Sequence, residues 1–232
     1  MPSGHSFPGS ERTRPARRIV LGSRSPRRLD LLRQIWPAEL IDVVPPSSTA
    51  EAHFENLHGW PSIERRLLEI AATKCEDVSA QVRKRLDPSV APPIVVTADT
   101  VVVVERAGGL LHVLGQPPAD DSWPETVRRW FREDYAGKTH LAATAVCVER
   151  LIAEGTALRE ERRARVVTSR VTFVADVDRW LDWYLSTGEP RGKAGGYALQ
   201  GAGSLFIEKV EGSLSNVVGL PLAELLDMLI RD

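Results

Sequence analysis

The sequence predicts an α/β protein in which helices flank a mixed β-sheet. Short apolar, β-branched runs alternate along the chain with segments of helical periodicity. Residues 94–104 are almost continuously apolar, which is typical of a strand buried on both faces. Segments 139–148 and 165–174 have the pattern of two paired strands. We expect these elements to form two lobes around a central cleft.

The composition is that of a globular protein without a global attraction for polyanions. The 232 residues are 43% hydrophobic and 26% charged, and the formal net charge is -1. Such a balance produces no field that favours nucleic acid or an acidic membrane surface. The longest apolar run is interrupted by Asp99 and is too short to span a bilayer. We therefore expect neither nucleic acid nor a membrane as a partner.

The ends and the cysteines suggest a cytoplasmic protein. Residues 1–17 are polar, basic and rich in Pro, Ser and Gly, without the apolar core of a secretory signal, and we expect a disordered leader before one domain over 18–232. Cys75 and Cys147 lie in apolar or helical patterns without metal-ligand spacing, so both are expected to be buried thiols in a reducing compartment.

The first half of the chain predicts two strands and two helices. Apolar residues 19–21 form a short strand, and Ser25-Pro26 then begins a helix that ends near Gln34. Residues 40–44 form the next strand, which Pro45-Pro46 ends. A long loop over 47–60 has no steady period, and long loops inside compact domains are often functional. Pro61 then begins a helix that ends near Leu86.

The second half continues the alternation after the buried strand. The charged stretch 149–163 between the paired strands is either an extension of their hairpin or a solvated insertion. The remaining elements are an amphipathic helix over 120–133, a helix over 176–186 with Asp176 as its N-cap, a glycine-rich loop over 187–196, two short strands within 197–210, and a helix over 220–230.

The turn from Leu21 to Arg28 is the first candidate for substrate chemistry. A strand ends there and a helix begins, and the free N–H groups of a helix N-terminus attract anions. Ser23 and the adjacent Arg27 and Arg28 have groups that bind phosphate oxygens, and arginine does so bidentately. The simpler interpretation is a capped helix with solvated arginines.

A second candidate is Asp99, which precedes Thr100 inside the apolar run. An ionised carboxylate within a buried strand is costly unless it is paired or binds a metal. Such a group can hold a divalent ion or deprotonate an attacking water. The alternative is a bulge that brings Asp99 to the surface.

The remaining candidates, in two loops and on one helix, are less specific, and the simpler interpretation is an ordinary surface loop with solvated charged side chains. Lys193, in the glycine-rich loop, can place a point charge beside a phosphate, and Glu189 can ligate a metal or act as a base. The loop is not a P-loop, because neither Ser nor Thr follows Lys193. Glu51 and Glu55 lie in the long loop, Lys74 lies on the helix after it, and no histidine pair has the spacing of a zinc site.

Six segments in this order resemble the Maf family, also called septum formation proteins. They are Leu21 to Arg28, Ala72-x-Lys74, Ala98 to Val102, Gly137-x-x-His140 with Thr144, Gly188 to Gly201, and Gly212-Ser213 with Asn216 to Leu222. The resemblance extends from Ile19 to about Leu226. It implies a mixed α/β fold similar to that of the inosine triphosphate pyrophosphatases, with the active site in a cleft between lobes.

The resemblance also implies hydrolysis of nucleoside triphosphates to the monophosphate and pyrophosphate, with a divalent cation (Mg, Mn or Co). Asp99 is then the general base and a metal ligand. Glu51 is a second metal ligand or acid, although Glu55 is the alternative in this loop. Ser23, Arg28, Lys74 and Lys193 are the expected phosphate-side contacts.

Base preference follows from three positions of the same resemblance. The branch that prefers dTTP and UTP has Arg, Thr and Gln where this chain has Arg27, Thr100 and Gln200. The amide of Gln200 offers the donor and the acceptor that pair with the imide edge of thymine or uracil. The alternatives are hydrolysis of 7-methyl-GTP and a nucleotide-binding regulator of septation with weak catalysis.

Two further expectations concern a substitution and the assembly. The chain has Gln116 where the family usually has the lysine of a Gly-Lys-Pro motif, and glutamine neutralises no phosphate charge. The family resemblance implies a homodimer. Four tryptophans are candidates for either its interface or the core: Trp123, Trp130, Trp180 and Trp183.

Overall fold

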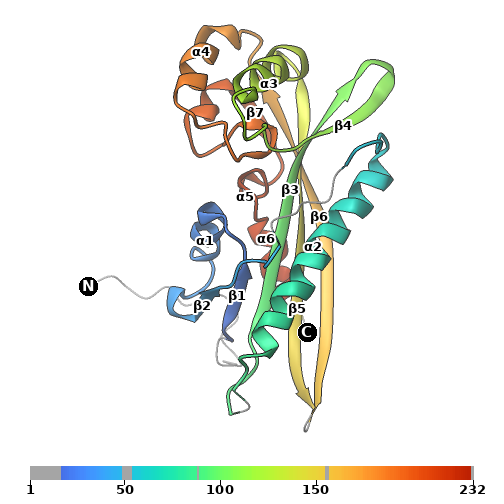
Figure 1. Ribbon diagram of the computed structural model, residues 1–232, viewed down its shortest axis with the longest axis vertical. Coiled ribbons are helices and arrows are strands. Elements are labelled where there is room, and N and C mark those ends of the chain that lie inside the picture. The colour runs from blue at the N-terminus through green and yellow to red at the C-terminus, as the bar shows by residue number, and fades with distance from the viewer. Residues whose placement is uncertain (1–16, 49–53, 88, 155–156, 231–232) are drawn as a thin grey trace, which may run out of the picture.

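One seven-stranded mixed sheet organises the chain (Figure 1). The computed structural model describes residues 17–48, 54–87, 89–154 and 157–230. Along the sheet the strands follow the order β2-β1-β3-β5-β6-β7, and β4 pairs with β3. The strands are β1 (Ile19–Gly22), β2 (Ile41–Val43), β3 (Ile94–Arg106), β4 (Leu110–Leu114), β5 (Thr139–Glu154), β6 (Ala157–Phe173) and β7 (Ile207–Glu211). Strands β1, β2 and β3 are parallel, whereas the other pairings are antiparallel.

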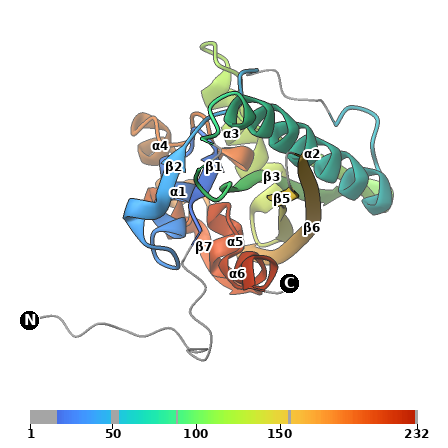
Figure 2. The same cartoon turned by 90° about the horizontal axis from the view of Figure 1, so that it is seen from below.

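Helices cover both faces of this sheet. Figure 2 shows α2 on one side of β5 and β6, and α5 and α6 on the other. The α-helices are α1 (Pro26–Leu32), α2 (Trp60–Arg83), α3 (Trp123–Arg129), α4 (Asp178–Ser186), α5 (Leu214–Val218) and α6 (Leu222–Ile230). A π-helical turn, Trp130–Tyr135, continues α3. Short 3₁₀ segments cover Ala38–Leu40, Ala107–Gly109, Ala194–Gly196 and Ala202–Phe206.

Strand β3 forms the centre of the core, as its apolar run predicts. Its side chains alternate between the two faces of the sheet. Val101 and Val103 pack with the buried face of α2, while Val96 and Ala98 pack with α1 and α6. Both faces of the strand are therefore buried, and the predicted mixed α/β class is confirmed.

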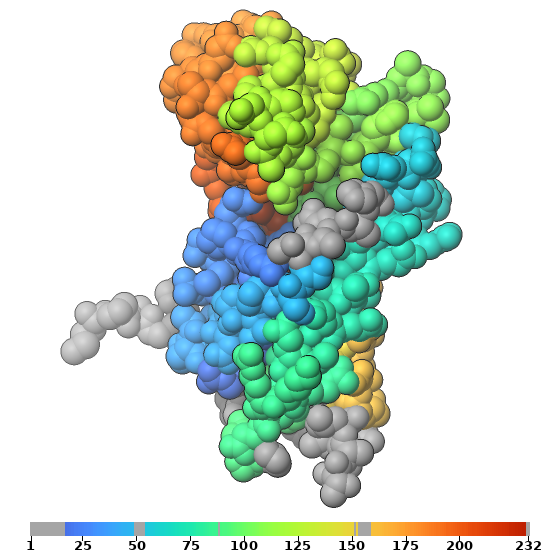
Figure 3. Space-filling model, in the orientation of Figure 1, coloured from blue at the N-terminus to red at the C-terminus, as the bar shows by residue number. Residues whose placement is uncertain are grey.

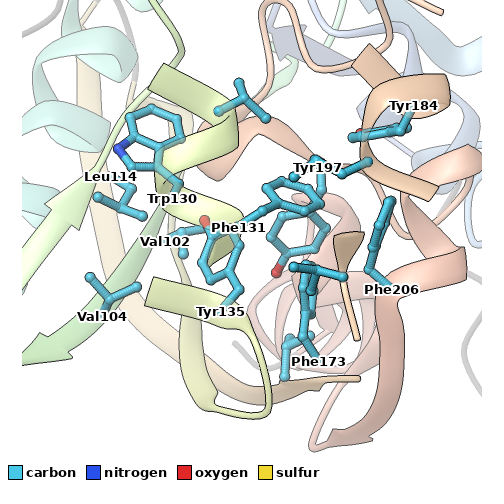
Figure 4. Close-up of a cluster of buried hydrophobic side chains, with 14 of the residues drawn as sticks. Val102, Val104, Leu114, Trp130, Phe131, Tyr135, Phe173, Tyr184, Tyr197 and Phe206 are labelled. Carbon is cyan, nitrogen blue, oxygen red and sulfur yellow. The ribbon is translucent and has the colours of Figure 1, made fainter. Parts of the chain in front are cut away.

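The structure has two lobes along its long axis. Figure 3 shows residues 107–135 and 175–206 stacked above residues 18–48 and 60–83. The upper lobe packs around aromatic side chains from the π-helical turn, α4 and β6 (Figure 4). Phe131 lies at its centre and contacts Tyr135, Phe173 and Phe206 edge-on. These edge-to-face contacts stabilise the aromatic cluster, which supports the segments that pack against it.

The charged stretch 149–163 extends the β5–β6 hairpin, so the hairpin interpretation is confirmed. Pairing continues from Glu149 opposite Arg162 to the end of β5. Glu149 is fully buried, and the Nε and Nη2 atoms of Arg162 lie 2.8 and 2.6 Å from its Oε2. Opposite charges across the ladder therefore stabilise a segment with few apolar residues.

Several predicted boundaries were wrong. Helix α4 begins at Asp178 with Val177 at its N-cap, so Asp176 does not cap it. The segment 197–210 contains one strand, β7, because 202–206 forms a 3₁₀ helix. Strand β4 and helix α5 were not predicted, since both are five residues long.

The expectations for the cysteines and the tryptophans can be compared with the structure, whereas the leader lies almost wholly outside the described residues. Both cysteines are buried, and Trp130 belongs to the core, but Trp180 and Trp183 are exposed. Within the described ranges, every helix is too short or too polar to cross a bilayer. The proposed leader falls outside these ranges except for Arg17, whose carbonyl accepts a hydrogen bond from the Trp36 indole at 3.0 Å.

Candidate active site

The candidate site lies at a gap in the pairing of β3. Strand β1 pairs with β3 as far as Gly22 opposite Thr97, and β4 begins to pair at Leu114 opposite Val102. Residues 98–101 of β3 therefore have neither strand beside them on this edge. A cavity of ≈1160 Å³ opens at the gap between the lobes. Ligands of open α/β sheets bind where neighbouring strands end, and this gap is such a place.

The turn after β1 approaches the floor of the cavity closely. A Cβ atom on Gly22 would lie 2.6 Å from Thr97 Cγ2 and 2.9 Å from Val78 Cγ2, so only glycine fits there. Ser23 is buried, and its Oγ accepts the Ser25 N–H at 3.1 Å. Helix α1 has only seven residues, so its dipole contributes little, and side chains must supply most of the affinity for an anion.

Arg28 fastens three elements around the gap. Its Nη1 donates to the Ala98 carbonyl oxygen at 2.7 Å and lies 3.5 Å from Ser23 Oγ. Nη2 donates to Thr100 Oγ1 at 3.0 Å, and Nε donates to the Gly219 carbonyl oxygen at 2.8 Å. Each guanidinium nitrogen thus contacts the protein, so Arg28 shapes the cavity in addition to lining it.

A network of hydroxyls continues from Arg28 across the sheet. Thr100 Oγ1 lies 3.0 Å from Thr144 Oγ1, and the Thr144 hydroxyl donates to the Asn216 carbonyl oxygen at 3.1 Å. The Asn216 amide donates to the Ala142 carbonyl oxygen at 3.0 Å. Thr100 is therefore held in place by β5 and α5. The positioning by Asn216 was not predicted from the sequence.

Asp99 lies on the cavity floor and forms an ion pair with Lys74. Register is unbroken at Asp99, which pairs with Ala145, so the alternative of a surface bulge is wrong. The Asp99 side chain is 12% exposed, and the Lys74 ammonium donates to its Oδ1. Helix α2 is aligned for this contact because Thr97 Oγ1 donates to the Ala71 carbonyl oxygen at 2.8 Å. A nearly buried carboxylate thus faces the cavity with a cation beside it.

Further cations line the walls of the same cavity. They belong to Arg24, Arg27 and Lys193. Burial, and then the charge of Arg27, lower the pKa of Lys193, while Glu189 acts in the opposite direction. Several positive groups around one nearly buried carboxylate form a site for a polyanion.

The glycine-rich loop brings both of its predicted contacts to the cavity, but Glu189 serves elsewhere. Lys193 and Gln200 line the cavity. The Glu189 carboxylate accepts the N–H groups of Ala202 and Gly203 at 2.8 and 3.0 Å. Glu189 is not among the residues that line the cavity, which argues against the predicted role as a base or metal ligand there.

The other predicted residues fall into two groups. Glu55 and Gln116 are exposed side chains that line the cavity, whereas Glu51 lies outside the described residues. Sequence reasoning did not find His58 and His112, whose rings lie 5.1 Å apart at the cavity wall. Their proximity depends on a backbone contact, Leu111 N–H to His58 O at 3.2 Å, which no local pattern reveals.

The donors in the cavity suit a cation that brings ligands of its own. No group of three His, Cys, Asp or Glu side chains placed to hold a metal occurs among the residues that the structure describes. Mg²⁺ needs only one or two protein carboxylates when substrate phosphates and water complete its octahedron. Asp99, which lines the cavity, could serve as that carboxylate.

The fold and the site define an α/β protein with a cationic cleft built around one buried carboxylate. Comparison with known proteins gives the family: residues 18–231 match the Maf-like proteins, and the chain belongs to that family. The predicted resemblance is therefore confirmed.

Curated relatives cover nearly all of the chain. A protein of Anaeromyxobacter dehalogenans named dTTP/UTP pyrophosphatase is 41% identical over 217 residues, which are 93% of this chain and 94% of that protein. A Ruminiclostridium cellulolyticum protein of the same name is 33% identical over 92% of this chain and 95% of its own length. Among solved structures, a nucleoside-triphosphatase or dITP/XTP pyrophosphatase of Mycobacterium abscessus matches with a TM-score of 0.33 and 13% identity, covering 68% of this chain and 75% of its own.

Proposed function

We propose that this protein hydrolyses nucleoside triphosphates to the monophosphate and pyrophosphate. The observation that carries the proposal is the position of Asp99. Its carboxylate is nearly buried, paired with Lys74, and faces a cavity lined by Arg24, Arg27 and Lys193. The names of the curated relatives support the same reaction.

In this mechanism Asp99 is the general base that takes a proton from the attacking water. The Lys74 ammonium donates to Oδ1 of this carboxylate, and both residues line the cavity. The side chains of Arg27 and Lys193 neutralise the charge that develops on the phosphate oxygens in the transition state. Electrostatic stabilisation of this kind is usually the largest contribution to the rate. A divalent cation bound with the substrate, with Asp99 as a protein ligand, would supply further charge neutralisation.

We further propose that the preferred substrates are dTTP and UTP. Arg27, Thr100 and Gln200 lie in one cavity, as a shared role in recognition requires. Gln200 is exposed there, so its amide is accessible to the imide edge of a pyrimidine. Two relatives with this substrate in their name support the assignment.

The test is pyrophosphate release from a panel of nucleoside triphosphates with Mg²⁺, Mn²⁺ or Co²⁺. The panel includes dTTP, UTP, the purine triphosphates and 7-methyl-GTP. We expect release from dTTP and UTP by the wild type, a loss of about 10²- to 10⁴-fold in Asp99→Asn, and no loss in the exposed control Asp121→Asn.

Each other outcome has a distinct meaning. Activity confined to 7-methyl-GTP would retain the reaction and overturn the role of Arg27, Thr100 and Gln200 in pyrimidine preference. Binding of nucleotides without any release would favour a regulator of septation, with Gln116 as the substitution to revert to lysine. Full activity of Asp99→Asn would exclude Asp99 as the base.

A further inference from the structure

The carboxylate of Glu189 joins the two ends of the segment 189–203. This segment contains two of the proposed substrate contacts, Lys193 and Gln200. Glu189 follows α4, and its Oε2 accepts the Ala202 N–H at 2.8 Å. Its Oε1 accepts the Gly203 N–H at 3.0 Å, and the Tyr184 hydroxyl lies 3.4 Å from the same oxygen. The two ends of the segment 189–203 are therefore joined by a single side chain.

The backbone of the same residue holds the cation of the loop. The Lys193 ammonium donates to the Glu189 carbonyl oxygen. Gln200 stands two positions before Ala202, at the other end of the segment. Lys193 and Gln200 both line the cavity, so the position of each depends on Glu189.

Gly201 makes this closure possible. A Cβ atom at this position would lie 2.4 Å from Glu189 Oε1 and 2.6 Å from its Cδ. The carboxylate thus packs directly against the backbone beside Gln200, and any side chain at position 201 would push it away.

The middle of the loop is held separately, against the upper lobe and the turn after β4. The Gly195 N–H donates to the Gly115 carbonyl oxygen at 2.9 Å, and the Tyr135 hydroxyl donates to the Gly195 carbonyl oxygen at 2.9 Å. Tyr184 likewise donates to the Gly196 carbonyl oxygen at 3.1 Å. Loss of the Glu189 contacts should therefore release the two ends of the loop while its middle stays in place.

We propose that Glu189 is a positioning residue that sets the distance between the phosphate contact Lys193 and the base contact Gln200. The inference rests on the proposed function. Glu189 is assigned a positioning role because it is not among the residues that line the cavity, and its oxygens accept backbone N–H groups. By fixing Lys193 and Gln200 relative to each other, Glu189 lets the base and the phosphates of one substrate bind at the same time. Binding energy from the base is then used to position the phosphates for reaction.

The experiment compares kcat/KM for UTP with kcat/KM for a purine triphosphate in Glu189→Gln. The ratio of the two is independent of the fraction of folded enzyme, so simple destabilisation does not change it. The amide keeps one acceptor but directs an NH₂ group at the second backbone N–H. We expect the ratio to fall about tenfold, since small misplacements in a site have effects of this size.

A second variant perturbs the same contact from the other side. Gly201→Ala displaces the carboxylate without changing its chemistry, and it should lower the ratio in the same direction. The matched control is Glu208→Gln, an exposed carboxylate on β7, which should leave the ratio unchanged.

A pH profile adds a reading that loop damage alone does not produce. The charge of Glu189 raises the pKa of Lys193 against the effects of burial and Arg27. Its removal should move the alkaline limb of kcat/KM to lower pH in Glu189→Gln, but not in the control Glu208→Gln.

The outcomes separate the two proposals. An active wild type whose two variants keep the substrate ratio would overturn the role of Glu189 and leave the hydrolysis intact. A wild type without pyrophosphate release from any nucleotide would overturn the proposed function, and the inference with it.

Discussion

The Nε atom of Arg28 donates to the carbonyl oxygen of Gly219 at 2.8 Å, although 191 positions separate the two residues in the chain. This contact joins α1 to the turn after α5 at the edge of the cavity. Because the other guanidinium nitrogens reach Ala98 and Thr100, the first and last parts of the chain are tied to the centre of the sheet.

Replacement of Arg28 by lysine should therefore cost stability as well as substrate affinity. An ammonium cannot reproduce the planar fork, and hydrogen bonds of a charged donor contribute about 1.5–3 kcal/mol each. We expect a loss of about 3 kcal/mol in the free energy of unfolding, measured with urea. The control Arg33→Lys, with an exposed side chain just after α1, should have almost no effect. If Arg28→Lys and Arg33→Lys were equally stable, the stabilising role of the Arg28 hydrogen bonds would be wrong.

Lys74→Met tests the ion pair on the cavity floor. The ammonium orients the Asp99 carboxylate, so its loss should lower kcat by about 10²-fold, toward the value expected without a positioned base. Steady-state kinetics with UTP give the value. The exposed Lys84, just after α2, provides the control Lys84→Met, which should retain full activity. If Lys74→Met raised only KM, Lys74 would be a substrate contact and not a partner of the base.

The lowered pKa of Lys193 predicts an early loss of activity at alkaline pH. Lysine is charged below its pKa, so the contribution of Lys193 is present at low pH and disappears as pH rises through the lowered value. Lys193→Arg keeps the charge throughout, and its alkaline limb of kcat/KM should lie at higher pH than that of the wild type. A limb at the same pH in both proteins would assign it to another group.

Arg162→Met should destabilise the protein without changing its chemistry. Among the described residues, Arg83, 3.6 Å away, is the cation that remains beside the fully buried Glu149 in this variant. Removal of one partner from a buried pair costs about 3–5 kcal/mol, and we expect the lower figure because Arg83 remains. Thermal unfolding measures the effect, and kcat should be unchanged. Arg163→Met, in an exposed ion pair, should cost no more than about 1 kcal/mol.

Much of the fold follows from periodicity, because periodicity reports which faces of an element are buried. The apolar run of β3 and the spacing of Ile63, Leu67 and Ile70 in α2 predicted their elements closely. Strand β4 was not predicted because it is short and follows Gly108-Gly109. Its pairing with β3 stabilises it, and its own sequence pattern does not reveal it.

The site was predictable in its residue types but not in its roles. The buried carboxylate of Asp99 and the basic turn at Ser23 follow from the residues, whereas the role of Lys74 came only from the family resemblance. The roles of Arg28 and Glu189 depend on hydrogen bonds between residues that are far apart in the sequence, so no local pattern predicts them. The metal, the homodimer and the cytoplasmic location stay predictions.

The interruption in the pairing of β3 has a consequence for how this family can diversify. Connections that follow β1 and β4 meet at one short stretch of β3, while β5 pairs with that stretch along its opposite edge. Changes in length or sequence of those connections can remodel the entrance without altering any strand register. New substrate preferences are thus accessible through loop variation on one scaffold, and exchange of these loops with those of relatives is a rational route to engineered selectivity.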